Sequence, residues 1–180
     1  MLESLFSGIS EREWIGICAA CGAVWIFWVL WQGSKGKESS SRGGGIQLRV
    51  SKAAFIREVI RWCVGHFGLP PRSRTWPRVD LRYYKHRKVM GTYQQRGKVI
   101  TVYWGSHADL REVVNTVIHE YQHFLDIRSG KDDRAYDKEI KEVGYQDNSF
   151  ERKAREVADR WQKACFKDLE KRGVCRIVSK

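Results

Sequence analysis

The chain has 180 residues, of which 42% are hydrophobic, and its formal net charge at pH 7 is +12. This length suits one domain with an appendage, and the hydrophobic content is sufficient for a packed core. Two of the five cysteines lie in an apolar N-terminal segment, and Cys63, Cys165 and Cys175 form an odd set. These three lack the spacing of a disulfide framework, and no C-x-x-C pair lies outside the apolar segment, so we propose no cysteine metal site.

Residues 14–31 contain no charged side chain. A helix of that length extends about 27 Å, close to the hydrocarbon thickness of a bilayer. We therefore expect a single transmembrane anchor within residues 1–32, rather than a buried core helix, because the run has no polar face. Lys35, Lys37 and Arg42 follow the run, so the positive-inside tendency predicts that the C-terminal domain is cytoplasmic.

Residues 33–45 have the Gly/Ser composition of a flexible linker, so the folded domain should occupy residues 46–180. Residues 1–45 hold four acidic and four basic side chains, which leaves the whole net charge on that domain. Hydrophobic periodicity and turn signals then predict its elements in order: a strand at 46–50, a helix after Ser51 that ends before Pro70, strands at 79–84, 89–94 and 98–104, a hairpin turn at 95–97, a helix at 109–127, and a helix after Asn148.

The segment from Arg72 to Lys88 carries seven basic side chains, three interleaved aromatic ones and a single acidic residue, Asp80. Such a segment could be a solvated face of the domain. It could also contact anionic lipid at the cytoplasmic leaflet, or bind nucleic acid through phosphates and stacking. The sequence leaves these three interpretations open.

His119-Glu120-Tyr121-Gln122-His123 has the H-E-x-x-H pattern of zinc metallopeptidases. Residues four apart share one face of a helix, so the two imidazoles could hold one metal ion. Glu120 flanks that face and is placed to take a proton from a metal-bound water. The apolar stripe of this helix lies on the opposite side, so we expect both histidines outside the core, as metal ligands or as exposed side chains.

A zinc site of this kind needs a third protein ligand and leaves its fourth position to water. Glu151 is the candidate, because it continues the apolar stripe of the helix after Asn148, where a carboxylate facing inward needs a partner. The alternative is a capping box, in which the Glu151 side chain bonds the backbone amide of Asn148. Glu142 is the reserve candidate for the third ligand.

The strand Gly91-Thr92-Tyr93, a following strand at 99–102, the H-E-x-x-H helix and the helix that begins at Asn148 come in a recognisable order. Together they resemble a minimal gluzincin-type zincin, similar to small bacterial and phage metallopeptidase domains of the ImmA/IrrE kind. The resemblance covers residues 79–165. It implies an α+β fold with a small, mainly antiparallel sheet, and a peptide substrate lying along strand 89–94 or strand 98–104.

The same resemblance implies a residue for each role in the site. Zn²⁺ would be the cofactor, with His119, His123 and Glu151 as its ligands and Glu120 as the catalytic base. Tyr145, Tyr136 and His107 are candidates for stabilising the oxyanion.

The expected function is therefore a membrane-anchored zinc metallopeptidase that hydrolyses peptide bonds by metal-activated water. The alternative is a catalytically inactive zincin-like domain that acts as a membrane-tethered binding module for nucleic acid or an anionic partner. Activity that depends on Glu120 would separate the two.

Overall fold

The computed structural model describes residues 45–71, 73–128 and 130–178. The predicted anchor at 14–31 and nearly all of the predicted linker lie outside these described residues. No helix within them is both long and apolar enough to cross a membrane.

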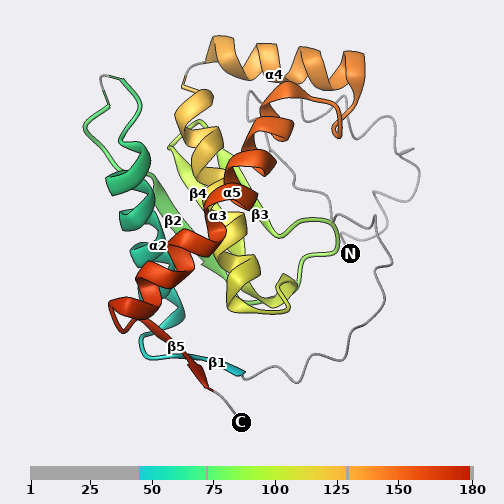
Figure 1. The fold of residues 1–180 in the computed structure, drawn as a ribbon. Coiled ribbons are helices and arrows are strands. Elements are labelled where there is room, and N and C mark those ends of the chain that lie inside the picture. Colours follow the sequence, from blue (N-terminus) through green and yellow to red (C-terminus); the bar gives the residue numbers. More distant parts are fainter. Residues whose placement is uncertain (1–44, 72, 129, 179–180) are drawn as a thin grey trace, which may run out of the picture.

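The described chain contains helices and two small sheets (Figure 1). In chain order the elements are β1 (Gly45–Leu48), α2 (Lys52–Phe67), β2 (Arg78–Arg82), β3 (Gly91–Gln94), β4 (Val99–Tyr103), the 3-10 helix η2 (Trp104–Ser106), α3 (Leu110–Asp126), α4 (Gly130–Val143), α5 (Ser149–Lys171) and β5 (Cys175–Val178). This is an α+β arrangement, as expected. The strand at the start of the domain and the three strands of its middle appear within a few residues of their predicted bounds.

The larger sheet has the strand order β2-β4-β3. β3 and β4 form the predicted antiparallel hairpin, in which Thr92 lies opposite Thr101. β2 runs parallel to β4 instead of pairing with its neighbour in sequence, so the sheet is mixed and not mainly antiparallel. β4 is therefore central, and β3 has an edge that no strand of the described chain pairs with.

The helix α3 lies at the centre of the domain, between the sheet and α5 (Figure 1). It also packs against α2, and the core forms where these elements meet. Fully buried side chains come from each of them: Phe55, Ile56 and Val59 of α2, Ile100 and Val102 of β4, Val114, Val117 and Ile118 of α3, and Ala158, Cys165 and Leu169 of α5. The apolar stripe predicted for α3 is thus buried in this core.

Two elements were not predicted from the sequence. α4 begins at Gly130, shortly after the predicted end of the helix at 109–127, and it lies across one end of α3 and α5 (Figure 1). β5 follows α5 and pairs antiparallel with β1, with Gly45 opposite Val178. The first and last strands of the described chain therefore lie side by side.

Candidate metal centre

The two histidines of the H-E-x-x-H motif lie one turn apart in the middle of α3. Asp109 starts this helix, because its Oδ1 accepts hydrogen bonds from the backbone amides of Arg111 (2.7 Å) and Glu112 (3.0 Å). The Nε2 atoms of His119 and His123 are 3.1 Å apart. The i, i+4 spacing has therefore brought the two ring nitrogens to one point, as the sequence predicts.

Both histidines are buried, with His119 1% exposed and His123 fully covered. The expectation that they lie outside the core was wrong. Helix α5 packs against α3, Glu151 of α5 faces both rings, and Tyr136 of α4 lies 6.1 Å from the His123 ring. A polar helix face need not meet water when other elements of the chain cover it.

Glu151 reaches this point from the first turn of α5. Asn148 caps that helix, since its Oδ1 accepts from the backbone amides of Phe150 (3.0 Å) and Glu151 (3.1 Å). The Glu151 carboxylate faces the imidazoles, with Oε1 3.1 Å from His123 Nε2 and Oε2 3.3 Å from His119 Nε2. One half of the proposed capping box is thus present, while the side chain that would complete it is directed at the histidines.

The three side chains form a group that could hold a metal ion, since one ligand atom from each lies within 4.8 Å of the others. Burial lowers the pKa of His119 to about 4, so this imidazole is neutral at pH 7. Burial alone would raise the pKa of Glu151, but the adjacent imidazoles bring it below the ordinary value and keep the carboxylate ionised. Two nitrogens and one anionic oxygen, buried and converging, are a donor set that suits Zn²⁺.

The reserve ligand, Glu142, does not take part. It lies exposed near the end of α4 and pairs with Lys138 at 3.7 Å. Asp126 is also outside the group: its Oδ1 is 2.7 Å from Lys153 Nζ, and its Oδ2 accepts from Gln122 Nε2 at 2.8 Å. The Asp126–Lys153 pair joins the end of α3 to the start of α5, and so supports the approach of Glu151 to His123.

Glu120 lies beside the three-residue group but is not part of it. It is fully buried, and neither carboxylate oxygen has a hydrogen-bond partner among the described residues. Burial raises its pKa well above the ordinary value, and the charge of Glu151 raises it further. A carboxyl group in these surroundings is suited to holding and releasing a proton.

Two tyrosines border the group on the side of α4. Tyr136 donates a hydrogen bond from its hydroxyl to Glu151 Oε1 at 2.7 Å. The hydroxyl of Tyr145, in the turn between α4 and α5, is buried and makes no hydrogen bond of normal geometry among the described residues. It lies close enough to Glu151 that burial, the charge of the carboxylate and a weak hydrogen bond to it together raise the tyrosine pKa. Tyr136 is thus firmly bonded to Glu151, whereas the Tyr145 hydroxyl is only loosely engaged by the same carboxylate.

His107, the third oxyanion candidate, belongs to a different set of contacts. Its Nδ1 lies 3.0 Å from the Tyr103 carbonyl oxygen and its Nε2 lies 3.0 Å from Thr116 Oγ1. The carbonyl can only accept, so Nδ1 carries the proton, and Nε2 of the neutral ring accepts from the Thr116 hydroxyl. His107 therefore positions Thr116, one turn before Glu120, and sequence reasoning had not identified this contact.

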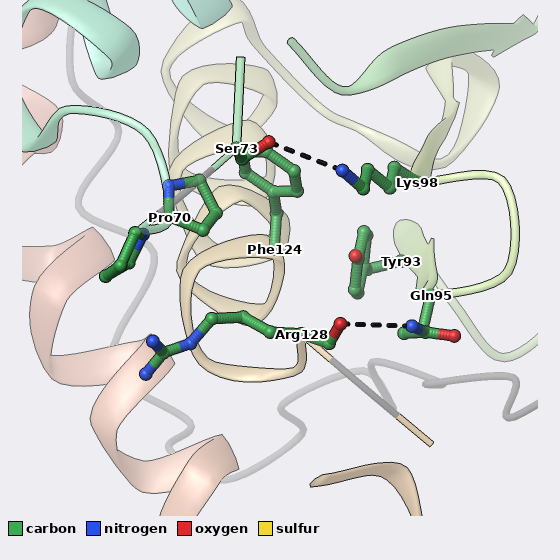
Figure 2. A pocket seen from close by; sticks show the side chains of 8 residues that line it. Pro70, Ser73, Tyr93, Gln95, Lys98, Phe124 and Arg128 are labelled. Atoms are coloured by element: carbon green, nitrogen blue, oxygen red, sulfur yellow. Dashed lines mark hydrogen bonds between the residues drawn. The ribbon is translucent and has the colours of Figure 1, made fainter. Parts of the chain in front are cut away.

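A separate pocket lies at the far end of the β3–β4 hairpin, beside the end of α3 (Figure 2). Its lining includes Pro70, Tyr93 and Phe124. Lys98 Nζ donates to Ser73 Oγ (3.3 Å) at its rim, and Gln95 Nε2 donates to the backbone oxygen of Arg128 (3.2 Å). None of the candidate metal ligands lines this pocket.

The chain matches no protein-family model, and no curated protein or solved structure is significantly similar to it. The geometry of His119, His123, Glu151 and Glu120 is therefore the basis on which a function can be proposed.

Proposed function

We propose that this protein is a membrane-anchored, zinc-dependent peptidase. The observation that supports the proposal is the convergence of His119, His123 and Glu151, from two helices, with Glu120 next to them and outside the ligand set. Peptide hydrolysis at zinc uses this arrangement, in which three side chains bind the metal and a fourth acts as the base.

Zn²⁺ at such a site supplies Lewis-acid chemistry, which acidifies water and polarises a carbonyl. The protein's own groups account for the proton transfers. Glu120, with two free oxygens in a buried position, accepts the proton of the attacking water and delivers it to the leaving amine. Tyr136 holds the Glu151 carboxylate in one orientation, and the Tyr145 hydroxyl donates to the oxygen on which negative charge develops.

β3 is the strand along which a peptide substrate would lie. Of the two strands that the sequence suggested for this role, β4 uses both of its edges inside the sheet, whereas β3 leaves one edge without a strand partner in the described chain. Gly91, at the start of β3, lies directly against Glu120. A peptide added to this edge would be held by backbone hydrogen bonds next to the base.

The four central side chains are at most 1% exposed, so a substrate reaches them only after a covering segment has moved. α4 is the element that we propose moves. Within the described part of α4, only Tyr136 and Asp133 have buried side chains and Ile140 packs partly buried against the core, so few apolar contacts hold the helix in place. The same enclosure is the observation that favours the alternative function, a catalytically inactive binding module.

Purified full-length protein and its Glu120→Gln variant would test the proposal. We expect both to contain close to one equivalent of zinc, and His119→Ala and His123→Ala to have lost it. Cleavage of an unfolded protein such as casein should fall by several orders of magnitude in Glu120→Gln. A Glu120→Gln variant as active as the parent would contradict the peptidase. Zinc binding without cleavage in either protein would support the binding module.

A further inference from the structure

One end of the domain is where the first and last strands of the described chain meet. β1 begins at Gly45 and pairs with β5, and Ser51 caps α2 three residues after β1 ends. The ammonium group of the next residue, Lys52, lies 5.6 Å from the centre of the Tyr83 ring and 5.0 Å from that of Trp104. The chain thus enters the domain close to the loop that follows β2.

That loop exposes cations and aromatic rings together. Within residues 82–88 every residue except His86 is exposed, and Tyr83 and Tyr84 are 65% and 56% exposed. Arg82 pairs with Asp80 at 2.7 Å, but the three cations that follow have no ion pair among the described residues. The sequence has no acidic residue from Leu81 through Ala108. Apart from the Arg82–Asp80 pair, the positive charge of this loop is therefore not compensated by its sequence neighbours or by any ion pair among the described residues.

The backbone of this loop is also held by contacts with η2 and within the loop itself. A Cβ on Gly105 would lie 2.8 Å from the backbone nitrogen of Lys85, so the two segments are in direct contact. Ser106 Oγ accepts from the His86 amide at 2.9 Å, and His86 Nδ1 accepts from the Lys88 amide at 3.2 Å. These contacts provide hydrogen-bond acceptors for the backbone amides of His86 and Lys88, while the charged side chains of the loop are exposed. A prearranged surface of this kind loses less conformational entropy on binding than a flexible loop.

We propose that this surface docks on an anionic lipid membrane. We call it the docking face and define it by Lys52, Arg82, Tyr83, Tyr84, Lys85, Arg87 and Lys88. Cations attract anionic headgroups, and tyrosine rings suit the headgroup region because one end is apolar and the other polar.

The place where the chain enters favours lipid over nucleic acid as the occupant. This step rests on the proposed membrane anchor at residues 14–31. A flexible linker of the length of residues 33–45 has an average span of about 20 Å. It would keep the domain at about that average distance from the bilayer, so the docking face would meet the lipid charge, which acts within about 10 Å of the surface, at a high effective concentration.

Docking would also limit the substrates. η2, whose Trp104 touches Lys52, leads directly into α3, and His119 lies nine residues beyond the start of that helix. Nine residues of helix rise about 14 Å. The candidate metal centre would thus be held near the membrane surface, and the substrate class that fits is juxtamembrane segments of other proteins.

Lysine acetylation of the full chain in lipid nanodiscs tests the docking face. The discs contain phosphatidylcholine alone or with phosphatidylglycerol, which has no amine to react. We expect acetylation of Lys85 and Lys88 to slow several-fold only with phosphatidylglycerol, and to recover at high salt. Lys138 and Lys141 of α4 are exposed and serve as controls within the same molecule. Equal rates on the two lipids, or equal slowing at Lys138 and Lys85, would overturn the proposal.

Charge variants give a second measurement. In the triple variant Lys85→Gln, Arg87→Gln and Lys88→Gln, the rate at Lys52 should be the same on both lipids. In the matched triple variant Arg134→Gln, Lys138→Gln and Lys141→Gln of α4, Lys52 should remain protected.

Two further outcomes are decisive. If a single-stranded oligonucleotide slowed the acetylation of Lys85 and Lys88 and phosphatidylglycerol did not, lipid docking would be overturned in favour of nucleic acid. The triple variant of Lys85, Arg87 and Lys88 should still bind zinc and cleave a soluble peptide, so loss of docking is distinguishable from failure of the proposed peptidase. If that variant fails to fold, the lysine rates of the parent protein on the two lipids decide the question alone.

Discussion

Gly91 and Glu120 are in direct contact across the interface between β3 and α3. A Cβ at Gly91 would lie 3.1 Å from both Cγ and Oε1 of Glu120, and 2.5 Å from Cγ2 of Thr116. No side chain fits between strand and helix there. The proposed base and the proposed substrate strand are thus held together because position 91 has no side chain.

Gly91→Ala should therefore separate β3 from α3. We expect a loss of stability of about 1–3 kcal/mol from overpacking, and a drop in cleavage with zinc content retained. Thr116→Ser removes the nearest atom, Cγ2, while keeping the hydroxyl that bonds His107. In the double variant the melting temperature should recover more than the activity does, since the contact with Glu120 remains. Normal activity in Gly91→Ala would rule out a close-fitting strand.

The local parts of the candidate site could be predicted from the sequence. The spacing of His119 and His123 fixes their shared face on any helix, and the cap at Asn148 sets the register in which Glu151 points inward. Their burial could not be predicted, because it comes from α4 and α5 folding back over α3. Patterns local in sequence, the H-E-x-x-H spacing and the cap at Asn148, identified the candidate ligands, while the packing of elements distant in sequence produced the enclosure.

The missed elements have a similar explanation. Gly130 looks like a helix stop, but it also starts a polar helix whose first turn carries Asp132 and Asp133, which favour a helix N-terminus. The pairing of β2 with β4 depends on the chain passing over β3, and alternation within one strand carries no information about its partner. The order of strands in the sheet could therefore not be predicted from the hydrophobic pattern of the sequence.

The two site tyrosines should respond differently to the same change. Tyr136→Phe removes the hydrogen bond to Glu151 and should lower zinc affinity by about 10–100-fold. Tyr145→Phe removes a hydroxyl that makes no hydrogen bond of normal geometry among the described residues, so zinc affinity should fall less than in Tyr136→Phe while kcat falls by about 100-fold. A zinc competition titration and steady-state kinetics on each variant separate the two roles. Reversal of the two results would exchange the assignments.

Asp133 should weaken the fold near neutral pH. It is 8% exposed, and burial, aided by Asp137, raises its pKa to about 6. The unfolded carboxyl loses its proton at lower pH than the folded one, so stability falls as the pH rises from about 4 to 6. Asp133→Asn should gain about 1 kcal/mol at pH 7 and little at pH 4. Melting curves at both pH values, with exposed Asp147→Asn as the control, check this; an equal gain at both would contradict it.

The predicted anchor gives a prediction about topology. Residues 46–180 should be cytoplasmic and stay with the membrane after a high-salt wash, because a spanning helix is not released by screening charges. A reporter fused after Lys180 should be active only when it folds in the cytoplasm. Activity of a reporter that works only outside the cytoplasm would reverse the orientation, and release of the protein by salt would exclude the anchor.

The assignment of Glu151 as a ligand can be separated from its place next to a helix cap. Its carboxylate faces both imidazoles, whereas the cap of α5 is made by Asn148 Oδ1. Glu151→Gln should thus lose most of its zinc and all cleavage, even in a folded protein. Asn148→Ala should lose about 1 kcal/mol of stability and keep nearly all of its zinc.

Zinc content and melting temperature, measured for these two variants side by side, are the test. A third variant, Glu142→Gln, controls for the loss of one negative charge, because Glu142 is exposed and pairs with Lys138 rather than with either imidazole. It should match the parent in both measurements. If Glu151→Gln retained full zinc and melted like the parent, the carboxylate would not be a ligand. The two histidines would then need a third donor from outside the described residues or from the substrate itself.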